Sequence, residues 1–163
     1  MSFFLALALV GGDAEAGKLA DGFRGQDWGR YEDGKLKTSG SCVASPEKDS
    51  AFVCQQQFGD ASIEVAYMAE FNIFYGIFAV GTSFDNCSGF FNVLKAAYGE
   101  GSPKVKSMNK WGDERYWFDG NVGASWSYNQ FSKQCTFTIS HFDFYDEAKK
   151  PSMDRAKEAA QGL

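Results

Sequence analysis

"NIFYGIFAVGTSFDNCSGFFNVLKAAYGEGSP", residues 72–103, joins two segments whose apolar residues recur with different periods. The first segment, 72–81, is apolar at nearly every position, which is typical of a central strand covered on both sides. Its Gly76 would let a neighbouring segment approach closely. We therefore expect residues 72–81 to form the centre of a β-sheet.

The second segment predicts the main helix of the protein. Its apolar residues recur at helical spacing, at Phe90 or Phe91, Leu94, Ala97 and Tyr98. Asp85 or Asn86 is the expected N-cap. Gly99 stands where a left-handed C-cap belongs, and Pro103 prevents continuation. The simplest role for such a helix is to cover one face of the sheet.

Strand patterns lie on both sides of this helix. Before the helix, strands are predicted at 51–58 and 63–67, with a turn at Gly59-Asp60 between them. After the helix, strands are predicted at 115–118, 122–128 and 135–140. Gly112-Asp113 and Asp119-Gly120 mark turns before and after the first of these. Short connections of this kind favour antiparallel pairing. The sequence thus predicts an α+β fold, a curved antiparallel sheet of about six or seven strands with one main helix packed on a face.

The N-terminal residues resemble an export signal. The apolar run 3–10 is too short for a membrane span, which needs about 20 residues. Ala14-Glu15-Ala16 has the small-x-small form that signal peptidase accepts, although Met1-Ser2 lacks the usual Lys or Arg. We expect a signal peptide at 1–16 and a periplasmic or secreted protein. The alternative is that run 3–10 is a buried strand or helix.

The remainder, 17–163, has the length of a single α+β domain with an apolar core. Its C-terminal tail is charged and rich in alanine, which predicts a short peripheral helix from Ser152 to about Gly162. The net charge is −5 for the whole chain and −3 without residues 1–16. This mildly acidic balance without a basic stripe argues against nucleic acid as a partner. No apolar run predicts a transmembrane segment, and no motif indicates a cofactor.

A short motif follows the predicted signal. Phe23-Arg24-Gly25, followed by Trp28-Gly29, resembles the opening of small exported bacterial proteins of unknown function with an FRGxxWG-like motif. The resemblance covers residues 22–29 only. The apolar continuation usual in those proteins is replaced here by Tyr31-Glu32-Asp33-Gly34-Lys35. The resemblance implies export and carries no information about chemistry.

The chain has four cysteines, Cys42, Cys54, Cys87 and Cys135, and their spacing suits disulfide bonds that stabilise a fold. No pair has the C-x-x-C spacing of a zinc or redox motif, so no metal site is expected. In an exported chain an even count implies disulfides, and four cysteines can pair in three ways. Cys135 shares its strand face with Phe137 and Ile139, while Cys87 begins the covering helix. We therefore favour a Cys87–Cys135 bridge between helix and sheet and a local Cys42–Cys54 bridge.

The single histidine raises the question of catalysis. His141 with Asp143, and with Asp146 or Glu147, would suit acid–base chemistry, and in an extended strand His141 and Asp143 would share a face. No nucleophile motif such as G-x-S-x-G accompanies them. We therefore expect a solvated strand end that leads into an acidic helix start.

The sixteen Phe, seven Tyr and four Trp are the most unusual feature of the composition. In Tyr116-Trp117-Phe118, Trp117 is expected to point opposite to its two neighbours. Core packing is the commoner use of rings, so we expect both faces to be covered, one by the helix and the other by the tail or N-terminal loop. An uncovered ring set would instead form a patch for a protein, a peptide or a sugar.

These observations favour a non-catalytic, exported and disulfide-stabilised binding or accessory domain, with candidate binding residues Tyr116, Trp117, Phe118, His141 and Asp143. Two alternatives remain open. One is an inhibitor or immunity-type protein that blocks an envelope enzyme. The other is a hydrolase that uses His141 and the nearby acids.

Overall fold

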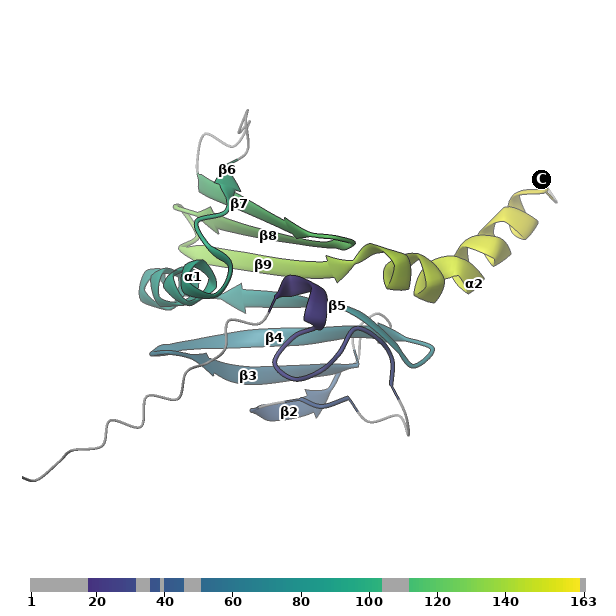
Figure 1. The fold of residues 1–163 in the computed structure, drawn as a ribbon, viewed down its shortest axis with the longest axis horizontal. Helices are drawn as coiled ribbons and strands as arrows, with labels where there is room; N and C mark the ends of the chain where they lie inside the picture. Colours follow the sequence, from purple (N-terminus) through teal and green to yellow (C-terminus); the bar gives the residue numbers. More distant parts are fainter. Residues whose placement is uncertain (1–17, 32–35, 39, 46–50, 104–111, 162–163) are drawn as a thin grey trace, which may run out of the picture.

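The computed structural model describes residues 18–31, 36–38, 40–45, 51–103 and 112–161. The predicted signal peptide therefore lies outside the described residues, as does the stretch 104–111 that precedes the strand around Tyr116. Within the described part, an antiparallel sheet carries two helices, which confirms the predicted α+β class (Figure 1).

The sheet is open, and neighbouring strands along it follow one order from edge to edge (Figure 1). The order is β2 (Ser41–Ala44), β3 (Phe52–Phe58), β4 (Ala61–Glu70), β5 (Ile73–Gly81), β9 (Gln134–His141), β8 (Val122–Asn129), β7 (Gly112–Asp119) and β6 (Ser102–Pro103); β1 (Gly29–Arg30) pairs with β5 off this path. The predicted central strand is thus central, because β5 joins the two halves of the sheet.

The predicted strands are all present, with two differences. The short strands β1, β2 and β6 add to the predicted set. Strand β7 begins at Gly112, so Gly112-Asp113 is part of a strand and not the predicted turn. Pairing with β8 along its whole length explains this, since Gly112 lies opposite Asn129 and Asp119 lies opposite Val122.

Helix α1 (Phe84–Tyr98) covers one side of the sheet, which we call the inner face. Its N-cap is Ser83, whose side chain accepts a hydrogen bond from the Asn86 amide at 3.2 Å. The prediction of Asp85 or Asn86 as the cap was wrong, because the cap lies two or three residues earlier and the helix begins at the apolar Phe84. The predicted C-cap is confirmed at Gly99, whose amide bonds the Lys95 carbonyl at 2.9 Å.

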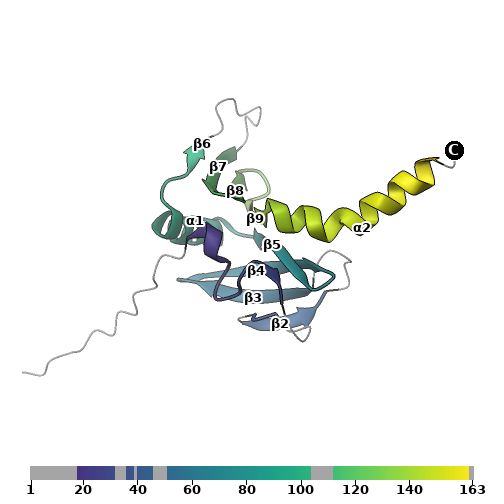
Figure 2. The same cartoon turned by 45° about the vertical axis from the view of Figure 1, so that its right-hand side comes forward.

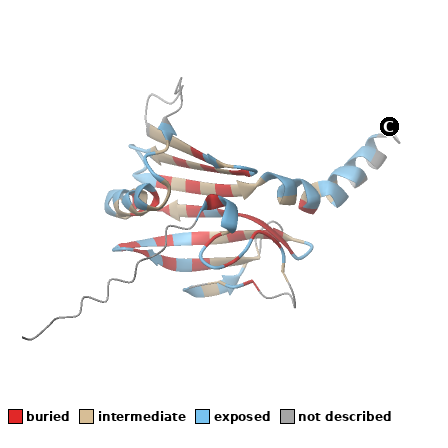
Figure 3. Ribbon diagram, viewed as in Figure 1, coloured by how far each residue is buried: buried red, intermediate tan, exposed pale blue. Residues whose placement is uncertain are grey.

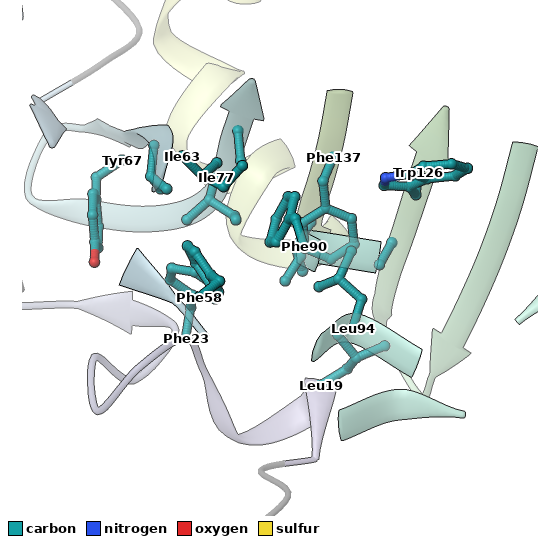
Figure 4. Packing of buried hydrophobic residues seen from close by; sticks show 14 of the residues in the cluster. Leu19, Phe23, Phe58, Ile63, Tyr67, Ile77, Phe90, Leu94, Trp126 and Phe137 are labelled. Atoms are coloured by element: carbon teal, nitrogen blue, oxygen red, sulfur yellow. The ribbon is translucent and has the colours of Figure 1, made fainter. Parts of the chain in front are cut away.

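The inner face carries the core. Buried residues alternate with exposed or partly buried ones along β3, β4, β8 and β9, as a sheet with one covered face requires (Figure 3). Phe90 and Leu94 of α1 meet Phe58 and Phe137 of the sheet (Figure 4), with ring centroids of Phe90 and Phe137 5.6 Å apart. The helix thereby closes the inner face over the middle strands.

The N-terminal segment completes this cover. Phe23 and Trp28 of the FRGxxWG-like motif are buried, and the Trp28 indole donates to the Leu19 carbonyl at 2.8 Å. Leu19 belongs to a short 3-10 helix, η1 (Leu19–Asp21), that lies over the same face. Arg24 places its guanidinium 4.6 Å from the centre of the Phe58 ring. In this chain the motif is therefore part of the folded core.

Both predicted bridges are present. Cys87 and Cys135 join the first turn of α1 to β9, and Cys42 and Cys54 lie opposite each other on β2 and β3. Among the described residues no cysteine is free. The first bridge fixes the helix to the sheet, and the second closes a local loop.

Helix α2 (Phe142–Gln161) follows β9 directly and projects away from the sheet (Figures 1 and 2). The predicted start at Ser152 was wrong by ten residues, because Pro151 lies inside the helix instead of preceding it. The first turns dock through Ala148, which is fully buried against Ile73 and Tyr75. Within the described residues, neither helix has the length and apolar character needed to cross a membrane.

Candidate functional site

The outer side of strands β7, β8 and β9 carries a shallow groove at the point where α2 begins. Its volume is about 210 Å³. The residues that line it, together called the outer groove, are Tyr116, Phe118, Gly123, Ala124, Ser125, Thr138, Ser140 and Phe142. None of these residues carries a charge. The groove therefore combines aromatic rings, small residues and hydroxyl groups.

Strand register brings these residues together. Directly opposite residues on neighbouring strands share a face of the sheet. One such row runs from Phe78 on β5 through Thr138 and Ser125 to Tyr116 on β7. Its ends are about 14 Å apart, since neighbouring strands are about 4.8 Å apart. The row therefore places two hydroxyl residues between two rings.

A second row runs beside the first. It passes from Ser140 through Gly123 to Phe118. A side chain at Gly123 would begin 2.6 Å from the Phe142 ring and 3.3 Å from the Phe118 ring. Glycine at this position thus lets both rings approach the floor of the outer groove.

The rings of the outer groove face solvent. Phe118 is 72% exposed and Phe142 is 46% exposed, while Phe78 at the far side of the row is 40% exposed. Tyr116 points the same way, and its hydroxyl donates to the Glu114 carboxylate at 3.1 Å. The expectation that both faces are covered was wrong for this part of the sheet, because α2 leads away from β9 and leaves these rings open.

The hydroxyl groups of the floor have capacity for a ligand. Ser127 and Thr136, one row farther along, bond each other at 2.8 Å. Within the described residues, the hydroxyls of Ser125, Thr138 and Ser140 take part in no side-chain hydrogen bond. Each hydroxyl supplies one donor and two acceptor positions. The floor therefore offers both donors and acceptors to a molecule in the outer groove.

The inner side of β7 borders a larger cleft of about 680 Å³. Trp117 lines this cleft, and its indole donates to the Gly99 carbonyl at 3.0 Å. The Asp119 carboxylate accepts a hydrogen bond from the Ala20 amide at 3.1 Å. Burial raises the pKa of the Tyr98 phenol in the same cleft above its ordinary value, and the Arg24 charge partly opposes this. The polar groups of the cleft thus tie η1 and α1 to the end of β7.

His141 and Asp143 do not form a site together. Asp143 lies in the first turn of α2, so the expectation of a shared strand face was wrong. Its carboxylate accepts a hydrogen bond from the Asn121 amide group at 2.6 Å. The His141 ring packs on Phe144 with centroids 4.4 Å apart, and its buried Nδ1 has no partner among the described residues.

A second acid near His141 in the sequence is engaged by another residue. Glu147 pairs with Arg30. No hydrogen bond joins His141 to an acid in the described part of the chain. A search of those residues for three or more grouped His, Cys, Asp or Glu side chains finds no such cluster. The arrangement around His141 is that of a packed strand end.

Of the predicted binding residues, the structure brings Tyr116 and Phe118 into the outer groove, although both also border the inner cleft, and it places Trp117 in the inner cleft alone. Trp117 is buried and points opposite to its neighbours, as predicted. The sequence-based list of binding residues left out Phe142, and sequence reasoning missed the hydroxyl floor, although Ser125, Thr138 and Ser140 follow the alternation of β8 and β9. No protein-family model, curated protein or solved structure matches this chain.

Proposed function

We propose that this protein is an exported, non-catalytic binding domain that contacts its ligand through the outer groove. The observation that carries the proposal is the exposure of Phe118 and Phe142 beside free hydroxyl groups. Burying one exposed phenylalanine ring lowers the free energy by about 1.5–3 kcal/mol. Phe118 stays exposed when the chain folds, so folding does not gain this free energy there. A ligand that covers the outer groove would use it.

The proposal does not include catalysis. A general acid or base needs a reacting group within hydrogen-bond reach, and a nucleophile needs a base beside it. The outer groove offers uncharged hydroxyls, and the histidine lies on the other face of β9, opposite Val122. Ligand binding through rings and hydroxyls accounts for the outer groove without a chemical step.

Export is supported by the two disulfide bridges, because such bonds persist in oxidising compartments. We expect protein produced through an export route to begin at Gly17 and to weigh four hydrogens less than the reduced chain. Mass spectrometry under non-reducing conditions tests both expectations. Four alkylatable thiols on a full-length chain would contradict them.

Binding is tested on an array that carries neutral and charged oligosaccharides together with peptides, including proline-rich ones. We expect the labelled protein to bind a limited set of spots and Phe118→Ala to lower that signal at least about tenfold. Phe131→Ala is the matched control, because Phe131 is 67% exposed but lies in the turn at the opposite end of β8. Equal losses in the two variants, or no binding by the wild type, would contradict the proposal.

A further inference from the structure

We propose that the ligand of the outer groove is a neutral, β-linked pyranose chain. This inference rests on the proposed function, since it names the ligand class of the same groove. Three properties of the outer groove carry it: its lack of charge, its pairing of rings with hydroxyls, and its floor of small residues.

The lack of charge selects a neutral ligand. No lining residue is ionisable at neutral pH, and the nearby acids are hydrogen-bonded: Glu114 accepts from the lining Tyr116 hydroxyl at the border of the groove, and Asp143 accepts from Asn121. An anionic polymer would therefore find no cation in the outer groove. Binding that lacks ion pairs is little affected by salt.

The rings and hydroxyls match the two kinds of surface on a pyranose. When both the hydroxyls and the glycosidic oxygens of a sugar are equatorial, as along a β-linked glucan, its faces present C–H groups, which suit the negative face of an aromatic ring. The rim of the sugar presents hydroxyls, which suit Ser125, Thr138 and Ser140. The exposed rings of Phe118 and Phe142, and the strand hydroxyls that bond no other described side chain, supply both partners.

The floor also distinguishes a sugar chain from a peptide. Proteins bind peptides in a few common ways. An extended peptide pairs with a sheet edge, a helical peptide lies in an apolar groove, a proline-rich peptide docks between aromatic residues, and an acidic or phosphorylated peptide binds a cluster of arginines. The outer groove lies on a sheet face, and its floor consists of Gly123, two serines and a threonine. Such a floor has no deep side-chain pocket. A proline-rich peptide is the other ligand class, and the experiment separates the two.

The test is depletion of the full chain from solution by insoluble polymers: cellulose, chitin and β-1,3-glucan as neutral β-linked chains, starch as the α-linked control, and crosslinked polygalacturonate as the anionic control. We expect retention by at least one neutral β-linked polymer. This retention should not fall in about 0.5 M NaCl, because salt screens interactions between charges and none is expected in the outer groove. Starch and polygalacturonate are expected to retain at least about tenfold less.

Three variants link retention to the outer groove. Phe118→Ala is expected to lower retention about tenfold or more, and Ser125→Ala combined with Thr138→Ala about threefold to tenfold. Gly123→Ala is expected to lower retention because its methyl group would displace the Phe142 ring. Phe131→Ala is the control and should retain like the wild type. Circular dichroism verifies that each variant is folded.

Each outcome has a defined meaning. Retention by starch or polygalacturonate equal to that by the β-linked polymers overturns the inference, as does equal loss in Phe118→Ala and Phe131→Ala. A proline-rich peptide that binds in a Phe118-dependent way, with no polymer retained, overturns the sugar inference and leaves the proposed binding function standing. If neither polymers nor peptides bind, both proposals fail.

Discussion

The two faces of strands β7, β8 and β9 are made by alternate residues of the same chain, yet they differ in chemistry. The inner face carries Trp117, Trp126 and Phe137, all buried. The outer face carries small hydroxyl residues, flanked by Phe118 and Phe142 in the open. Aromatic residues are therefore present on both faces, but only one set is packed.

The difference lies in what the rings contact. On the inner face, Phe137 meets Phe90 and Trp117 edge to face. On the outer face, Phe118 and Phe142 border glycine and hydroxyl residues. Inner rings stabilise the fold, because they lose water and gain neighbours together. Outer rings add little to folding, and this leaves them available for a ligand.

The largest effect is expected on the inner face. Phe137→Ala removes a fully buried ring with two aromatic neighbours. We expect the free energy of unfolding to fall by about 4–5 kcal/mol, because the lost burial is joined by a cavity. Urea unfolding under oxidising conditions measures this. A loss below about 1 kcal/mol would mean that the inner face does not carry the core.

The bridges are expected to rank next. Replacing both Cys87 and Cys135 by Ala removes a link across 48 residues and should cost about 4 kcal/mol, whereas the Cys42 and Cys54 pair spans 12 residues and should cost about 3 kcal/mol. The first bridge also holds α1 over the inner face. Thermal unfolding of the two double variants compares them. The reverse ranking would show that α1 covers the face without its bridge.

Gly76 gives an intermediate case, because it faces outward in the part of the sheet that α2 and Met68 cover. A methyl group at this position would begin 2.5 Å from the Ile139 carbonyl and 2.7 Å from the Met68 side chain. We expect Gly76→Ala to cost about 2 kcal/mol through overpacking. Unfolding in urea tests this. An unchanged midpoint would indicate that the whole outer face is open.

The smallest stability effect is expected on the open outer face. Phe118→Ala should change the free energy of unfolding by less than about 0.5 kcal/mol, because the ring is 72% exposed. The same urea titration, run beside Phe137→Ala, provides the comparison. If the two variants lost similar stability, Phe118 would belong to the core and the outer groove would not be a free surface.

Local patterns sufficed to predict most of the fold. The alternation along 122–128 and 135–140 predicts strands with one apolar face, and the helical spacing around Leu94 predicts α1. The same alternation placed Cys135 on the inner face, so its bridge to Cys87 was predicted correctly, and the short spacing of Cys42 and Cys54 predicted the other. Errors arose where a local signal allows two interpretations. Ser83 and the polar residues after it are all suitable N-caps, and Ser83 is the one that caps α1. Pro151 was interpreted as preceding a helix, but it lies inside α2.

The candidate site was less predictable, because it depends on register across several strands. Tyr116 and Phe118 were found, since both flank the inward Trp117 on one strand. Thr138, Ser125 and Tyr116 form one row only through the pairings of β9, β8 and β7. Phe142 joins the outer groove because α2 starts where β9 ends. Periodicity does not show which polar face is solvated and which is flanked by open rings.

Two adjacent residues of β9 allow the most direct test of the central claim. Thr138 points into the outer groove, and Ile139 is fully buried on the inner face. The measurement is their methyl chemical shifts during titration with a soluble oligosaccharide of the polymer that retains the protein best. We predict a saturable shift of the Thr138 methyl, with the Ile139 methyl unchanged. A larger shift at Ile139, or none at Thr138, would contradict it.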